Sequence, residues 1–212
     1  MPAHDELLSS SERKHRAILE AAEQLFLRDG YLGTSMDELA EQSGVSKQTV
    51  YKHFGSKELL FIELVTSMTA GAGDGLYELG GLPTETSELA PYFTQYAVDE
   101  LRIVMTPRLI QLRRLVIGEV GHFPKLAEAL FKNGPQRSIK SLTAVITELS
   151  RRGLLTATNP ERAATTLNWL VLAAPINEAM LRGDAAIPAP SSLNTHATEA
   201  IRVFLAAHAT KP

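Results

Sequence analysis

The chain has 212 residues, of which 44% are hydrophobic and 21% are charged, and its formal net charge at pH 7 is −3. This length and composition suit one or two soluble domains with a substantial core, and the lack of cysteine excludes a disulfide framework, a thiol nucleophile and a cysteine zinc site. Because we find neither a signal peptide nor a membrane-spanning run, we expect a cytoplasmic protein.

The N-terminal residues follow the spacing of amphipathic helices. A capping box S-x-x-E at Ser9–Glu12 precedes apolar side chains that recur every three or four residues until Gly30. A second capping box, Ser35–Glu38, opens a short helix. Gly44 is suited to end that helix, because glycine readily adopts the left-handed conformation of a C-cap. These signals predict two helices, with a turn after the second.

A third predicted helix runs from Ser46, as its N-cap, to about Phe54 and carries the most uneven charge of the chain. From residue 46 to 57 there are three lysines and no acid, whereas residues 1 to 45 hold nine acids. Positive charge is therefore concentrated on one part of a mildly acidic protein. Such a protein can approach a phosphate backbone in one orientation.

A helical wheel, at about 100° per residue, places Val50 and Phe54 on the inner side of this helix. Gln48, Thr49 and Lys52 lie on the opposite side, and Tyr51 and His53 lie on its two flanks. A helix in the major groove has base edges ahead of it and phosphates on each side. Two short helices joined around Gly44, the second with this pattern, therefore predict a helix-turn-helix that binds DNA.

The first turns of the neighbouring helices add candidate phosphate contacts, because their free backbone N–H groups suit phosphate oxygens. Ordinary helix capping and a solvated lysine face are the alternative interpretation. The predicted DNA-binding residues are Thr34, Ser35, Ser46, Lys47, Gln48, Thr49, Tyr51, Lys52, His53 and Lys57.

Glycine and proline become frequent between residues 71 and 88, which predicts a link between two domains, 1–70 and 71–212. The second domain also shows helical spacing. An apolar stripe from Leu89 to Val104 is followed by a helix opening at Pro107, with breaks at 121–124 and at Asn133–Pro135. Helices are then predicted from about Pro135 to Gly153, over 160–182 and over 192–209.

The stretch GTSMDELAEQSGVSKQTVYKHFGSKELLF, residues 33–61, resembles the DNA-binding signature of TetR-type transcriptional regulators. The resemblance rests on the A-x-x-x-G-V-S turn that ends at Ser46, the T-x-Y-x-x-F helix and the following S-K-E-x-L. It implies an all-α repressor with an N-terminal three-helix DNA-binding domain and a C-terminal helical domain that binds a small molecule and dimerises. Gln48 stands where many members have a small residue, which suggests a distinct base preference.

The second predicted domain carries more aromatic and apolar bulk than a small core needs, which is typical of a ligand site. The alternative for the polar candidates is that they face solvent or make a hydrogen bond within the core. The alternative for the aromatic candidates is that they are ordinary core residues. The predicted ligand-binding residues are Tyr96, Arg102, Met105, Leu112, Phe123, Asn168 and Trp169. We expect a small and largely apolar effector.

The helices predicted over 160–182 and 192–209 mix small residues with Leu167, Ile201 and Phe204, which suits a four-helix bundle between two copies. The alternative is that these stripes are intramolecular core. We predict a homodimer on a palindromic operator in double-stranded DNA, released by its effector. We expect no metal, no cofactor, no catalytic residues and no membrane partner.

A second hypothesis is an all-helical small-molecule-binding protein or enzyme in which the helix-turn-helix is only structural. Such a protein has no need to exclude acids from residues 46 to 57. The acid-free face therefore favours DNA binding, whereas fold analogy alone does not establish it.

Overall fold

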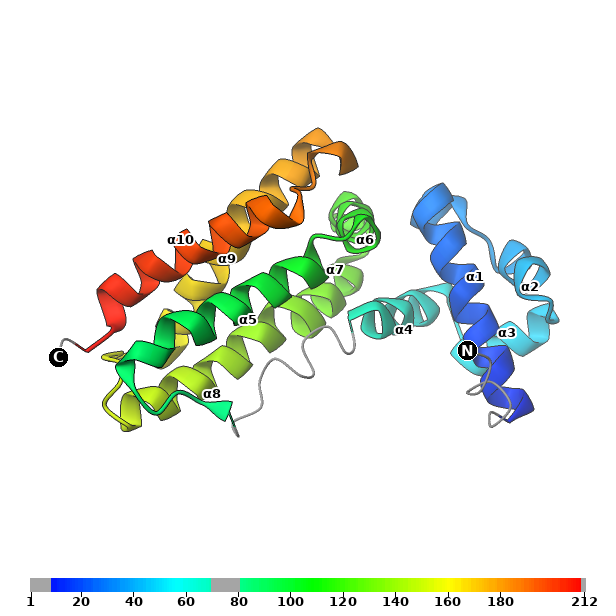
Figure 1. Ribbon diagram of the computed structural model, residues 1–212. Helices are drawn as coiled ribbons and strands as arrows, with labels where there is room; N and C mark the ends of the chain where they lie inside the picture. Colours follow the sequence, from blue (N-terminus) through cyan, green and yellow to red (C-terminus); the bar gives the residue numbers. More distant parts are fainter. Residues whose placement is uncertain (1–8, 70–80, 211–212) are drawn as a thin grey trace. The chain divides into compact units, whose positions relative to one another are not determined.

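The computed structural model describes residues 9–69 and 81–210, which are mostly helical (Figure 1). In chain order the helices are α1 (Ser10–Gly33), α2 (Met36–Ser43), α3 (Lys47–Phe54), α4 (Lys57–Thr69), η2 (Thr86–Glu88), α5 (Leu89–Val104), α6 (Pro107–Glu119), α7 (Pro124–Phe131), η3 (Lys132–Gln136), α8 (Arg137–Arg151), α9 (Pro160–Arg182), η4 (Asp184–Ala186) and α10 (Pro190–His208). The all-α prediction is confirmed. None of the described helices is long and apolar enough to cross a membrane.

The chain forms two compact units. The first contains the described residues of Met1–Met68 together with Gln111–Leu130, and the second contains those of Thr69–Ile110 and Phe131–Pro212. Segment 111–130 thus groups with the N-terminal helices, whereas the sequence analysis assigned it to the second domain. Much of the predicted link, residues 70–80, lies outside the described residues.

The first unit is built on the inner face of α1, where the apolar residues have the predicted helical spacing. Ile18 and Phe26 are fully buried, and the ring of Phe26 meets that of Phe61 on α4 edge to face, with 5.0 Å between centroids. At Gly30 the backbone has φ 79° and ψ 172°, and α1 then continues to Gly33. Glycine allows this kink because it has no Cβ.

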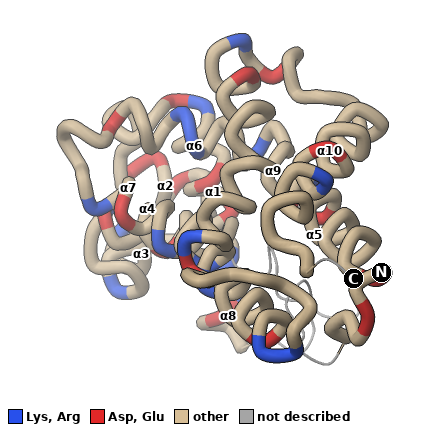
Figure 2. The backbone as a smooth tube through the Cα atoms, turned by 90° about the vertical axis from the view of Figure 1, so that its left-hand side faces the viewer, with Lys and Arg blue, Asp and Glu red and all other residues tan. Residues whose placement is uncertain are grey.

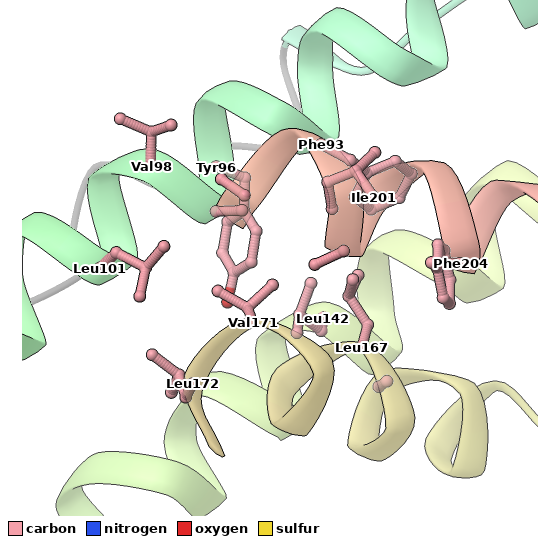
Figure 3. Close-up of a cluster of buried hydrophobic side chains, with 14 of the residues drawn as sticks. Phe93, Tyr96, Val98, Leu101, Leu142, Leu167, Val171, Leu172, Ile201 and Phe204 are labelled. Atoms are coloured by element: carbon pink, nitrogen blue, oxygen red, sulfur yellow. The ribbon is translucent and has the colours of Figure 1, made fainter. Parts of the chain in front are cut away.

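The second unit packs α5, α8, α9 and α10 around one apolar cluster (Figure 3). The rings of Phe93 on α5 and Phe204 on α10 lie 5.6 Å apart between centroids. Leu142 on α8 and Leu167 on α9 are fully or almost fully buried in the same cluster. Each of the four helices therefore contributes its inner face to one core.

This core contains residues that the sequence analysis assigned to a dimer face. Leu167, Ile201 and Phe204 are at most 1% exposed within one chain, so the intramolecular alternative holds for them. The apolar side chains that remain exposed on α9 and α10 include Trp169 and Val203. Periodicity correctly found an apolar face but could not tell which neighbour covers it.

The predicted break at Asn133–Pro135 is wrong. The chain continues from α7 into α8 through the π-helical turn η3, with Pro135 buried inside it. Proline has no N–H to donate to the preceding turn, and a π-helical turn changes the local hydrogen-bond pattern by one residue. The wider turn accommodates the proline without ending the helical path.

A second proline, Pro175, lies inside α9 and leaves the carbonyl of Val171, four residues earlier, without its helical N–H donor. In the structure Nε2 of His196, on α10, lies 2.9 Å from this carbonyl oxygen. Since the carbonyl is an acceptor only, the ring nitrogen donates the hydrogen bond. His196 therefore compensates a backbone group that Pro175 leaves unpaired.

We expect His196→Leu to lower the free energy of unfolding by about 1–3 kcal/mol, because the Val171 carbonyl loses its donor. Pro175→Ala restores a backbone N–H to this carbonyl, so His196→Leu should cost less in that background. Urea denaturation of the four proteins measures both effects. Equal effects in the two backgrounds would contradict this account.

Candidate nucleic-acid interface

Local hydrogen bonds explain why residues 35–54 fold as two short helices. Ser35 opens α2 with the predicted capping box, in which its Oγ accepts from the Glu38 N–H at 3.2 Å and its own N–H donates to the Glu38 carboxylate at 2.8 Å. Gly44 ends α2 in the left-handed conformation, with φ 67°. Ser46 then caps α3, its Oγ accepting from the Thr49 N–H at 3.2 Å. The predicted helix-turn-helix is present.

Helix α3 turns its apolar side inward, as the helical wheel predicts. Val50 and Phe54 are 0% and 4% exposed, whereas Tyr51 is 44% exposed. On the remaining surface of α3, Lys47, Gln48 and Lys52 are exposed, and Thr49 and His53 are half-buried. Hydrogen-bonding side chains thus occupy the outer face of the helix, and their contact with DNA stays a prediction.

The charge on this face is positive. Figure 2 shows lysines and no acidic residue on α3. Lys47 makes an ion pair with Asp37 on α2, 2.9 Å between Nζ and Oδ1, and the hydrogen bond from Lys47 to Asp37 raises the pKa of the lysine. The predicted phosphate contact of Lys47 would replace this exposed ion pair, which reduces the net contribution expected from Lys47.

The two residues before α2 are engaged in capping. Thr34 is 1% exposed and donates its hydroxyl to the Gly30 carbonyl at 2.9 Å. The Ser35 hydroxyl donates to the Glu38 carboxylate at 2.8 Å, and the hydrogen bonds from Ser35 lower the pKa of Glu38. Capping accounts for both side chains, and a phosphate contact from either one stays a prediction.

Lys57 has a structural role that the sequence analysis did not predict. Its ammonium group donates to the carbonyls of Tyr31 at 2.8 Å and Thr34 at 2.9 Å and lies 4.6 Å from the centre of the Tyr31 ring. Burial lowers the pKa of Lys57. Two of its three N–H donors are thus used at the end of α1, and one is left for a phosphate.

Support for the back of α3 comes from His15, which the sequence analysis missed. Its ring stacks on Phe54 at 4.7 Å between centroids and lies 5.8 Å from the His53 ring. Its Nε2 is 2.7 Å from a carboxylate oxygen of Glu63 on α4. The sequence did contain a signal for His15, because His15 lies three residues before the buried Ile18 and therefore on the same side of α1.

The predicted ligand-binding residues are not gathered at one place. Tyr96, Met105 and Asn168 are buried in the second unit, and Leu112 and Phe123 belong to the first unit. Phe123 packs there against the ring of Tyr31, at 4.6 Å between centroids. Arg102 forms an exposed ion pair with Asp99, and Trp169 is 37% exposed. Arg102 and Trp169 therefore lie outside the core of their unit.

The sequence analysis also missed Glu100, a buried acid on α5. It is 3% exposed and accepts hydrogen bonds from Tyr96 and Ser138, while burial raises the pKa of its carboxyl group. The signal was an acid within the apolar stripe of the predicted helix, next to Leu101. Among the described residues, no group of three or more His, Asp or Glu side chains could hold a metal ion.

Two family models match the chain. Residues 18–64 match the model of bacterial regulatory proteins of the tetR family, and residues 92–210 match the C-terminal domain of AefR-like transcriptional repressors. The first match contains α2 and α3 with their turn. The second contains most of α5 and all of α8, α9 and α10.

Curated relatives match parts of the chain. The uncharacterised helix-turn-helix transcriptional regulator YezE of Bacillus subtilis is 27% identical over 119 residues, 56% of this chain and 61% of that protein. The DNA-binding transcriptional repressor TetR of Mycobacteroides abscessus is 32% identical over 79 residues, 37% of this chain and 42% of that protein. The chain therefore covers less than two thirds of the length of these relatives.

Solved structures match nearly the whole chain. A crystal structure described as a TetR-family transcriptional regulator from Mesorhizobium loti has a TM-score of 0.82 and 34% identity, and the match covers 96% of this chain and 100% of that one. The flavonoid-responsive regulator FrrA has a TM-score of 0.76 and 26% identity, over 95% of this chain and 100% of that one.

The two roles of lysines at this interface can be separated. We expect Lys57→Met to lower the free energy of unfolding by about 1–3 kcal/mol, because two partly buried carbonyls lose their donor, and also to weaken binding to DNA. Lys52→Met should weaken binding to all DNA sequences, lower the salt slope by about one and leave stability unchanged. Thermal melting and fluorescence anisotropy at several salt concentrations measure these effects. A Lys57→Met protein as stable as the parent would contradict the structural role.

Proposed function

Because the chain belongs to the TetR family of transcriptional regulators, we propose that it is a homodimeric repressor that binds a palindromic operator and is released from it by a small effector. Membership of this family already implies sequence-specific DNA binding of the repressor type. The dimer, the palindrome and the release by an effector are the further parts of this proposal, and each has its own support.

The single observation that carries the proposal is the outer face of α3. It combines the exposed Gln48, Tyr51 and Lys52 with the absence of acids from α3. Gln48 suits adenine, because its amide can pair with the N6 and N7 edge in the major groove. Tyr51 and Lys52 are suited to phosphate oxygens, which position the helix but carry no sequence information.

Support for the dimer comes from the outer side of α9 and α10. Trp169, Leu181 and Val203 are 37%, 77% and 42% exposed within one chain, and Ala173 is exposed between the first two. Large apolar side chains next to small ones suit close packing of helices from a second copy. A two-fold dimer would present two copies of α3 to the two half-sites of a palindrome.

Support for an effector comes from the relatives. FrrA is a flavonoid-responsive regulator by its name, which supports a small-molecule effector for this chain. Tyr96 and Met105 lie in the apolar core of the second unit. An effector that binds there acts as an inducer only if it binds the DNA-free state more tightly than the DNA-bound state.

The alternative is an all-helical binding protein or enzyme with a purely structural helix-turn-helix. The relatives and solved structures that the chain resembles are transcriptional regulators, and we propose no catalytic activity. Selection of bound fragments from random DNA by the full-length protein decides between the two. Enrichment of one palindromic sequence supports the regulator, and no enrichment supports the alternative.

We expect Gln48→Ala to change the base preference at one operator position by about 1–3 kcal/mol. Tyr51→Phe should weaken binding to all sequences alike, because it removes a phosphate contact. Binding is compared across single-base variants of the selected operator. Gln42→Ala on α2 is the matched control, since Gln42 is exposed and bonds to Gln24. An unchanged preference with Gln48→Ala would disprove its role in base recognition.

We expect Trp169→Asp and Val203→Asp to produce folded monomers, because each places a charge in the proposed dimer face. Phe204→Asp should instead unfold the second unit, since Phe204 is 1% exposed within one chain. Light scattering at micromolar concentration gives the oligomeric state, and circular dichroism gives the fold. Leu32→Asp, at a residue 64% exposed in the first unit, should remain dimeric. Dimers with both outer-face variants would place the interface elsewhere.

A further inference from the structure

The second unit contains an acid where an apolar side chain would be expected. Glu100 on α5 is 3% exposed, and its carboxyl group accepts a hydrogen bond from Tyr96, one turn earlier on α5, and another from Ser138 on α8. Three polar side chains from two helices thus meet at one place in the bundle, with Tyr96 and Glu100 buried and Ser138 half-buried. We call Tyr96, Glu100 and Ser138 the polar cluster.

A purely structural role explains the polar cluster poorly. Burial is the largest influence on the Glu100 carboxyl group and raises its pKa, and the two groups that hydrogen-bond to it are neutral hydroxyls. Removing a carboxyl group from water without a cation costs stability even when hydroxyl groups bond to it. Packing the bundle would be served as well by leucine or methionine at position 100, whereas ligand recognition needs a polar group.

A second observation points to a ligand in the same unit. Asn168 on α9 is 0% exposed, and neither its Oδ1 nor its Nδ2 has a hydrogen-bond partner. It lies one helical turn before Val171 and Leu172, which share the apolar cluster with Tyr96, and Figure 3 shows the Tyr96 ring directed toward Val171. An unpaired buried amide costs about 1–3 kcal/mol, and a bound ligand or an ordered water would relieve this cost.

We propose that the polar cluster and Asn168 form the recognition site for the head group of the effector, and that this head group is a hydrogen-bond donor on an apolar body. This deepens the proposed function and rests on it for the link to DNA release. The Glu100 carboxyl group accepts from the donor, and the Asn168 amide offers further donors and an acceptor. The shared chemistry fits an aromatic amine or a phenol.

The same groups disfavour an anionic effector. A carboxylate or phosphate placed beside Glu100 meets either a like charge or a neutral carboxyl group. A charged amine instead gains a charge-assisted hydrogen bond, which is stronger in this buried setting than in water. A phenol gains a neutral or charge-assisted bond according to the state of Glu100.

Four probes with one apolar body test the head-group preference on the full-length protein. They are naphthalene, 2-naphthol, 2-naphthylmethylammonium and 2-naphthoate, and their affinities are measured by calorimetry and by thermal shift. We expect the ammonium and the phenol to bind about tenfold more tightly than naphthalene, and 2-naphthoate to bind most weakly. The order of the two donor probes tells an amine effector from a phenolic one.

Variants connect this preference to the cluster. Glu100→Gln keeps the shape and an acceptor but removes the charge, so it should abolish most of the advantage of the ammonium probe and leave naphthalene unchanged. Ser138→Ala should reduce the advantage of both donor probes. Asp99→Asn is the matched control, because Asp99 is the neighbouring acid on α5 and forms a surface ion pair with Arg102; it should leave all four affinities unchanged.

The proposal is wrong if none of the four probes binds, if 2-naphthoate binds as tightly as the donor probes, or if Glu100→Gln leaves the ranking unchanged. Anisotropy with the selected operator keeps the two proposals apart. A probe ranking that depends on Glu100, in a protein that selects no DNA sequence, supports the recognition site and disproves the regulator. A protein that selects a DNA sequence but shows no such ranking supports the regulator and disproves the recognition site.

Discussion

The Lys57 ammonium group closes the loop on which the DNA-binding helices depend. Its hydrogen bond to the Thr34 carbonyl joins residues 23 positions apart, and the chain between them contains all of α2 and α3. Short helices of 8 residues are unstable alone, so their relative position has to come from caps, core contacts and this closure. A side chain with several donors suits the end of a helix, where carbonyls lack partners.

Capping could be predicted from sequence because it is local. The boxes at Ser9–Glu12 and Ser35–Glu38 and the cap at Gly44 involve residues at most four positions apart, and all three are present. The inner and outer sides of α3 could also be predicted from the sequence, since the apolar Val50 and Phe54 are expected to face the core. The family resemblance added the fold of the second unit, whose helices show periodicity but no informative motif.

The interactions that the sequence did not reveal are those between distant segments. Lys57 was predicted to contact a phosphate, because nothing in the sequence around it indicates hydrogen bonds to two carbonyls 23 and 26 residues earlier. Phe204 was assigned to a dimer face because an apolar stripe does not state which neighbour covers it. The break at Pro135 was predicted from proline chemistry alone, and the π-helical turn is a response of the whole backbone. Glu100 was not predicted, whereas Arg102, two residues later, was predicted to face a cavity and instead forms a surface ion pair with Asp99.

The fold of the second unit pairs one buried polar group of α9 and leaves another unpaired. The Val171 carbonyl, left without a donor by Pro175, receives one from His196 across two helices, which shows that this bundle can satisfy a buried group when stability is the requirement. Asn168 has two unpaired polar atoms in the same helix, only one turn away from Val171. The buried Ser150 hydroxyl on α8 is also unpaired, so the lack of a partner alone does not assign a role, and the binding role that we propose for Asn168 rests on its position one turn from the residues that pack with Tyr96.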